Sequence, residues 1–113
     1  MEEFKLYING AWTATESGSV RDDLNPADNS VMAKVHMAGP AEVEAAIQAA
    51  QTAFPAWAAM LAADREKLLL KAADYMEANT ERFAGYLIDE SGSCFMKAMD
   101  EVGQSVNIIR AAA

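Results

Sequence analysis

Two side chains in this sequence of 113 residues have the chemistry of a covalent catalyst, and each is the only one of its type: the thiol of Cys94 and the imidazole of His36. A thiol nucleophile needs a base, usually a histidine, within hydrogen-bond reach. These two residues fall on different predicted elements, and nothing in their spacing brings them together. Cys94 lies near the start of a predicted helix, a place that can lower the pKa of a thiol, but we expect it to be a small residue in the first helical turn without a catalytic role. For His36, at the end of a predicted strand, we expect a structural or solvent-facing role.

Other common site patterns are missing from the sequence. One histidine and one cysteine do not suffice for a zinc site, and the six glycines form neither G-x-G-x-x-G nor a phosphate loop. Asp89–Glu90 and Asp100–Glu101 are adjacent carboxylate pairs. Because neighbours on a helix point in different directions, we expect solvated carboxylates and no acid–base dyad.

The overall composition narrows the class of protein. The formal net charge of -8 opposes binding to nucleic acid or to an anionic membrane surface. No apolar run reaches the roughly 18–20 residues that span a bilayer. A single cysteine fits a reducing compartment, and the acidic residues after Met1 are unlike a signal peptide. We therefore expect a cytoplasmic globular protein without nucleic-acid or membrane partners.

The elements that must position these residues differ between the two parts of the chain. Residues 1–113 are predicted to form a single segment, in which 1–38 make two β-hairpins and 40–113 a helical layer. Asn9-Gly10 is a strong signal for a tight hairpin turn, because both central residues take positive φ there. The strands are expected at 5–8 with 11–14, and at 20–24 with 31–37 around a polar turn at 25–30.

Four helices are expected in the second part. The first runs from Pro40 to about Phe54 and is ended by Pro55; the second covers about 62–78. The third follows Asn79 as N-cap and ends at Gly92, and the fourth begins at Ser93 as cap. Apolar residues at helical spacing are expected to be buried, among them Val43, Ile47, Phe54, Leu68, Leu69, Met76, Leu87, Val102 and Val106. The sequence ends on alanines within a helix, so we expect the natural chain to continue.

An ordered set of motifs resembles one family over nearly the whole chain. Leu6–Trp12, Asn25-Pro26-Ala27, Ala53–Trp57 and Glu90-Ser91-Gly92 occur in the order typical of the N-terminal part of the NAD(P)-dependent aldehyde dehydrogenases. Gly92-Ser93, Phe95, Lys97-Ala98 and Glu101-Val102 resemble the branch acting on aromatic aldehydes such as benzaldehyde or vanillin. The resemblance implies an α/β parent fold.

The resemblance also implies a mechanism for the parent enzyme. Members of the family oxidise aldehydes to acids with NAD or NADP: a cysteine attacks the carbonyl, an asparagine and a backbone amide hold the oxyanion, and a glutamate activates water. These groups, the cofactor site and the oligomerisation arm would lie downstream of this stretch. Cys94 would then not be the nucleophile, and residues 1–113 alone would bind no cofactor and have no activity.

Two minor sites follow from the same resemblance. The helix after Ser93 flanks the family's substrate tunnel, so Asp100 and Gln104 are candidate tunnel neighbours, with a solvent-facing position as the alternative. Many members hold a structural monovalent cation, which points to Asp23, Leu24 and Glu90 as oxygen ligands. For Glu90 the alternative is a surface carboxylate at a helix end.

Two functions from different classes remain open at this point. The chain is an N-terminal fragment of an aldehyde dehydrogenase whose partner is the remainder of the enzyme, or it is a free-standing, non-catalytic helical interaction or self-association module. In the second case exposed apolar helix faces would bind a partner or a second copy.

Overall fold

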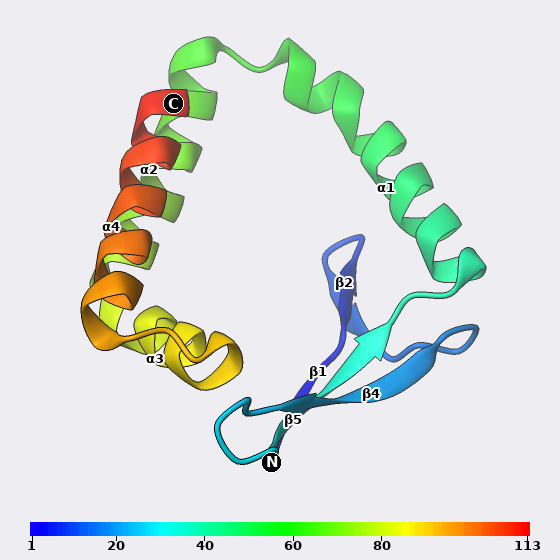
Figure 1. The fold of residues 1–113 in the computed structure, drawn as a ribbon. Coiled ribbons are helices and arrows are strands. Elements are labelled where there is room, and N and C mark those ends of the chain that lie inside the picture. The colour runs from blue at the N-terminus through cyan, green and yellow to red at the C-terminus, as the bar shows by residue number, and fades with distance from the viewer. The chain divides into compact units, whose positions relative to one another are not determined.

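Five strands and four helices follow one another along the chain in the computed structural model, which describes all residues 1–113 (Figure 1). Two units form by internal contact, Met1–Ala59 and Met60–Ala113. The first holds β1 (Glu2–Phe4), β2 (Leu6–Ile8), β3 (Ala11–Thr13), β4 (Ser19–Leu24), β5 (Val31–Met37) and α1 (Pro40–Ala59); the second holds α2 (Ala62–Ala78), α3 (Thr80–Ser91) and α4 (Phe95–Ala112). The two predicted hairpins and four helices are confirmed, but α1 groups with the strands rather than with the other helices.

The first hairpin forms as its turn residues predict. Asn9 and Gly10 have φ of 51° and 79°, the left-handed values that a two-residue primed turn requires. Strands β2 and β3 pair antiparallel, and their central partners Tyr7 and Trp12 place ring centroids 4.9 Å apart. Such cross-strand aromatic contacts stabilise a two-stranded ribbon that has little else to pack against.

The second hairpin lies in a sheet with an additional strand. β5 is central, with β4 antiparallel on one side and β1 parallel on the other. β1 was not predicted, because three residues of which two are acidic carry no strand signal, and their pairing with β5 is distant in sequence. The polar turn between β4 and β5 forms as expected, with Asn25 Oδ1 accepting from Ala27 N and Asp28 Oδ1 from Ser30 N, both at 2.9 Å.

The prediction that Pro55 ends the first helix is wrong. α1 continues through Pro55 to Ala59. Proline removes one backbone donor, but the alanines on both sides are the strongest helix formers and keep the following turn helical. The expected burial of the α1 stripe is also wrong, since no residue of α1 is buried and Phe54 is 64% exposed. Within its unit α1 has contacts with β2, which covers little of that apolar face.

The helical unit is organised around α4, which packs against both α2 and α3. Its core is Ala84, Ala98 and Val102, with larger side chains at the margin, namely Met76, Phe83, Leu87, Ile88 and Met99. The two alanines let the helices approach closely. Leu68 was expected in this core but is 45% exposed, because a spacing of five residues places it about 140° around the helix from Ala73, the buried residue of α2. No helix of the chain is both long and apolar enough to cross a membrane.

An ion-pair cluster joins α4 to α2 at the surface of the same unit. Arg110 reaches Glu77 at 2.6 Å and Asp74 at 3.1 Å. The guanidinium donates hydrogen bonds to the Glu77 carboxylate and holds the pKa of that carboxyl below its usual value. The cluster fixes the last turn of α4 beside α2.

The helix ends were predicted only in part. Gly92 caps α3 in the left-handed conformation, as expected. Asn79 does not cap α3 with its side chain; its amide donates instead to the Tyr75 carbonyl of α2, at 2.8 Å. Ser93 is not the cap of α4 either, because the N-cap is Cys94 and no side chain makes a cap hydrogen bond there.

Candidate functional site

The imidazole of His36 is buried and both its nitrogens are occupied. The Thr15 amide donates to Nδ1 at 2.9 Å, so the ring proton lies on Nε2, which donates to Glu3 Oε1 at 2.6 Å. This hydrogen bond is the main cause that lowers the pKa of Glu3. A histidine with both nitrogens engaged joins β1, β5 and the segment after β3, which supports the structural role expected for it.

Cys94 is a free, exposed thiol at the N-cap of α4. The only histidine of the chain is His36, which belongs to the other unit. Within the helical unit the thiol therefore has no imidazole to act as its base.

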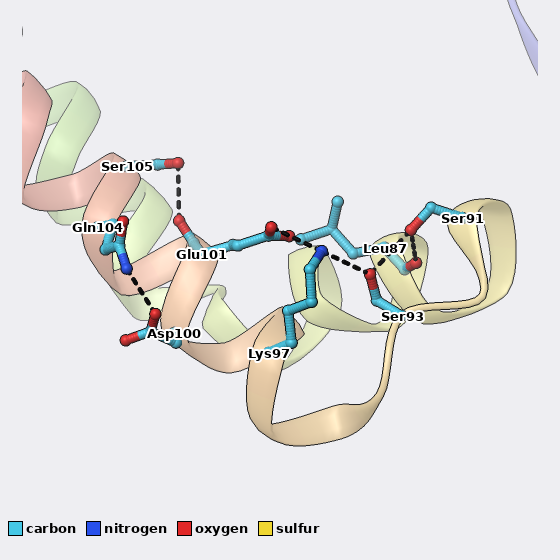
Figure 2. Close-up of polar contacts among 8 residues, drawn as sticks. All are labelled: Leu87, Ser91, Ser93, Lys97, Asp100, Glu101, Gln104 and Ser105. Carbon is cyan, nitrogen blue, oxygen red and sulfur yellow. Dashed lines mark hydrogen bonds and ion pairs between the residues drawn. The ribbon is translucent and has the colours of Figure 1, made fainter.

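A chain of polar contacts runs from the end of α3 along α4 (Figure 2). The Ser91 hydroxyl donates to the Leu87 carbonyl at 2.6 Å and lies 3.0 Å from the Ser93 hydroxyl. Lys97 donates to Ser93 at 3.3 Å and forms an ion pair with Glu101 at 2.7 Å. An ammonium that donates to Ser93 cannot also take its proton, so this arrangement orders the α3–α4 turn and does not make a serine nucleophile.

Asp100 and Gln104, the two predicted tunnel neighbours, are brought together by the helix. Gln104 Nε2 donates to Asp100 Oδ2 at 2.5 Å, and both residues are exposed on α4. Figure 2 shows the pair one turn apart. Gln104, but not Asp100, lines an open groove of about 460 Å³ whose other walls are mainly apolar, including Phe83, Leu87 and Ile108. This volume is within the range of small-molecule sites.

The proposed cation ligands are distributed over both units. Asp23 and Leu24 end β4, where the ladder is irregular: Asp23 pairs with Ala33 and Leu24 with Val31, so Met32 is an extra residue in β5. A bulge of this kind interrupts the ladder, which suits coordination by backbone oxygens. Glu90 is exposed in the last turn of α3.

The most heavily hydrogen-bonded carboxylate of the chain was not predicted. Glu42, in the first turn of α1, accepts from the backbone of Glu16 and Ser17 at 2.7 and 2.8 Å, from the Ser17 hydroxyl, and from Gly39 N at 2.9 Å. The hydrogen bonds from Ser17 and then Glu16 hold the pKa of Glu42 well below its usual range. The sequence signal was a glutamate at the third helical position, which often returns to the cap amide.

Comparison with known proteins identifies the family to which this sequence and fold are similar. The sequence model described as the aldehyde dehydrogenase family matches residues 12–113. A vanillin dehydrogenase of Corynebacterium glutamicum is 38% identical over 96% of the chain and 22% of its own length.

Solved structures agree over the same extent. The crystal structure of an NAD-dependent benzaldehyde dehydrogenase from Corynebacterium glutamicum superposes with a TM-score of 0.91 at 37% identity, over 96% of this chain and 24% of that one. A salicylaldehyde dehydrogenase from Pseudomonas putida G7, complexed with salicylaldehyde, gives 0.93 at 32% identity, over 99% and 23%. The chain thus spans about a quarter or less of the length of these relatives. With hairpins, helices and motif order all in agreement, this chain belongs to the aldehyde dehydrogenase family.

Proposed function

We propose that this chain is the N-terminal part of an enzyme that oxidises aldehydes, aromatic ones among them, to carboxylic acids with NAD or NADP as hydride acceptor. The observation that carries the proposal is the match to an NAD-dependent benzaldehyde dehydrogenase over 96% of the chain. Vanillin and salicylaldehyde, named for two other relatives, are also aromatic aldehydes. The single free cysteine is compatible with a cytoplasmic enzyme.

Residues 1–113 alone are proposed to be inactive. Both nitrogens of His36 are engaged, and Cys94 has no imidazole in its unit. The test is the increase in absorbance of reduced cofactor when the full-length enzyme or residues 1–113 are mixed with benzaldehyde, vanillin or an aliphatic aldehyde. We expect turnover by the full-length enzyme only. A full-length enzyme that reduces neither NAD nor NADP with any aldehyde would refute the assignment, and turnover by residues 1–113 would refute their inactivity.

Gln104 is proposed to face the substrate path, with Asp100 orienting its amide. Support comes from the position of Gln104 on the wall of the apolar groove and from the hydrogen bond between the two side chains. In the full-length enzyme, Gln104→Leu should change KM for vanillin relative to benzaldehyde and leave kcat nearly unchanged. Asp100→Asn keeps a hydrogen-bonding partner and serves as the matched control. Equal KM changes for both aldehydes would argue for a solvent-facing Gln104.

A monovalent cation is proposed at the carbonyls of Asp23 and Leu24 with the Glu90 carboxylate. The irregular ladder at the end of β4 and the hard oxygen donors are compatible with Na⁺ or K⁺. We expect the full-length enzyme to unfold at a higher temperature in KCl or NaCl than in an equal concentration of tetramethylammonium chloride, and Glu90→Gln to reduce that difference. An identical unfolding temperature in all three salts would exclude the site.

The remainder of the enzyme is proposed to cover the apolar side chains of α1, with self-association of residues 1–113 as the alternative. Phe54 is 64% exposed, and Val43, Ile47 and Trp57 are also exposed. Such a contiguous stripe is unusual on a monomer surface. Sedimentation of residues 1–113 should show association that Phe54→Glu reduces. If residues 1–113 stayed a monodisperse monomer at high concentration, the proposal that the apolar side chains of α1 must be covered by other protein would be contradicted.

A further inference from the structure

The connector Thr15–Gly18, between β3 and β4, has an unusual set of hydrogen bonds. Its four consecutive amides each donate to a side chain: Thr15 to His36 Nδ1, Glu16 and Ser17 to Glu42 Oε1, and Gly18 to Thr15 Oγ1, all between 2.7 and 2.9 Å. Most loop amides are satisfied by backbone carbonyls or water. Here the conformation of the connector depends on two titratable acceptors from outside it, one on β5 and one on α1.

The connector also touches the junction between β5 and α1 directly. A Cβ atom on Gly18 would lie 2.0 Å from the Met37 carbonyl oxygen, and one on Gly39 would lie 2.4 Å from the Ser17 carbonyl. Gly39 N donates to the other oxygen of Glu42 at 2.9 Å. The carboxylate therefore joins three segments: the connector, the junction and the first turn of α1.

A proton abolishes the acceptor at His36 Nδ1 and weakens the one at Glu42. Nδ1 of His36 accepts from Thr15 because the ring proton is on Nε2, facing Glu3 of β1. A proton on Nδ1 would direct a donor at a donor. Protonation of Glu42 removes the negative charge that strengthens these hydrogen bonds, and it places a hydrogen on one of two oxygens that both face backbone donors. The charged groups around these acceptors include Glu3, on which Lys5 and Lys34 act, and Asp22 of β4, which forms an ion pair with Lys34. Glu16 lies in the connector itself.

We propose that the connector Thr15–Gly18 is a proton-sensitive strap, closed on the start of α1 while His36 Nδ1 and Glu42 are both unprotonated and released stepwise when they take up protons. The first step frees the Thr15 amide, because a proton on Nδ1 would face the N–H group that now donates to it. The second step frees Glu16 and Ser17 in stronger acid, since the donors around Glu42 keep its pKa well below the usual range.

Amide hydrogen exchange followed by NMR on the chain 1–113 tests both steps. Protection factors, corrected for the intrinsic pH dependence of exchange, are measured for Thr15, Glu16 and Ser17 between pH 8 and pH 5. We expect protection of Thr15 to fall about tenfold over this range, the effect of losing a typical hydrogen bond. Glu16 and Ser17 should keep their protection.

Glu42→Gln separates the second step from the first. The amide keeps the size of the side chain but removes the negative charge from the oxygen that accepts from Glu16 and Ser17, and it places a donor opposite Gly39 N, so the protection of Glu16 and Ser17 should fall about tenfold at pH 8. Glu44→Gln is the matched control, because Glu44 is exposed and accepts only from Gln48 within the helix. Unchanged protection of Thr15 from pH 8 to pH 5 overturns the first step, whether or not the His36 ring titrates. Full protection of Glu16 and Ser17 in Glu42→Gln, or an equal loss in Glu44→Gln, overturns the second.

Discussion

Replacing Val102 by alanine should destabilise the helical unit by an amount that follows from its burial. Val102 is 2% exposed and lies with Ala84 and Ala98 at the centre of the only core cluster of that unit. Removing two carbons forfeits about 1.6 kcal/mol of transfer free energy at about 0.8 kcal/mol per methylene. The cavity left between three helices adds about 1 kcal/mol, so we expect a loss of about 2–3 kcal/mol in the free energy of unfolding.

The assay is thermal and urea unfolding of residues 1–113, followed by circular dichroism at 222 nm. For a small domain, about 2 kcal/mol corresponds to a fall in Tm of about 8–16 °C. Ile108→Ala is the matched control, because Ile108 is a β-branched residue on the same helix but 67% exposed. Both substitutions gain similar helix propensity, so their difference reports burial. Equal losses for the two variants, or a loss below about 0.5 kcal/mol for Val102→Ala, would refute the packing described for α4.

Three further predictions concern the helix ends and the charged clusters. Gly92→Ala should lower the free energy of unfolding in urea by about 1–2 kcal/mol, because Gly92 has φ of 68°. Gly103→Ala is the control: it lies inside α4 with open space around it, and should be neutral or stabilising by up to about 1 kcal/mol. Equal effects of the two substitutions would contradict the role of Gly92 as a helix cap. Arg110→Gln should lower Tm at low salt and lose that effect in 1 M NaCl, because the pairs with Glu77 and Asp74 are exposed; a salt-independent loss would contradict an ionic origin. The pKa of Glu42 is lowered on folding, so its contribution is present above the unfolded value of 4.5 and disappears as pH falls through the folded pKa. The stabilities of the native chain and Glu42→Gln should therefore differ most at pH 7 and approach each other progressively as the pH falls below 4.5, and a constant gap down to pH 2 would count against this account.

Local signals predicted the elements whose stability is local. Asn9-Gly10 specifies its turn because few other pairs tolerate two positive φ values. Gly92 similarly marks the end of α3. Both signals depend on the backbone conformation of the residue itself, so they can be recognised from the residue type without knowing any distant contact.

Features that depend on distant contacts could not be predicted in this way. β1 exists through pairing with β5, a strand that lies about thirty positions away. The Asn79 side chain could cap α3 or bond to α2, and only the path of the chain favours the Tyr75 carbonyl. Glu42 has the sequence pattern of a helix-start glutamate, but its bonds to Glu16 and Ser17 arise because the connector folds back onto α1. The candidate residues Asp100 and Gln104 were found through family resemblance, and helix geometry then explained why they meet.

The position of β1 has a practical consequence for handling the protein. Its paired residues begin at Glu2, and Glu3 holds the Nε2 proton of His36. A purification tag fused at Met1 would therefore directly precede the edge strand β1, in which Glu3 orients the buried imidazole of His36. A tag fused after Ala113 would follow three exposed alanines, Ala111–Ala113, and is the better choice for the measurements that depend on Thr15.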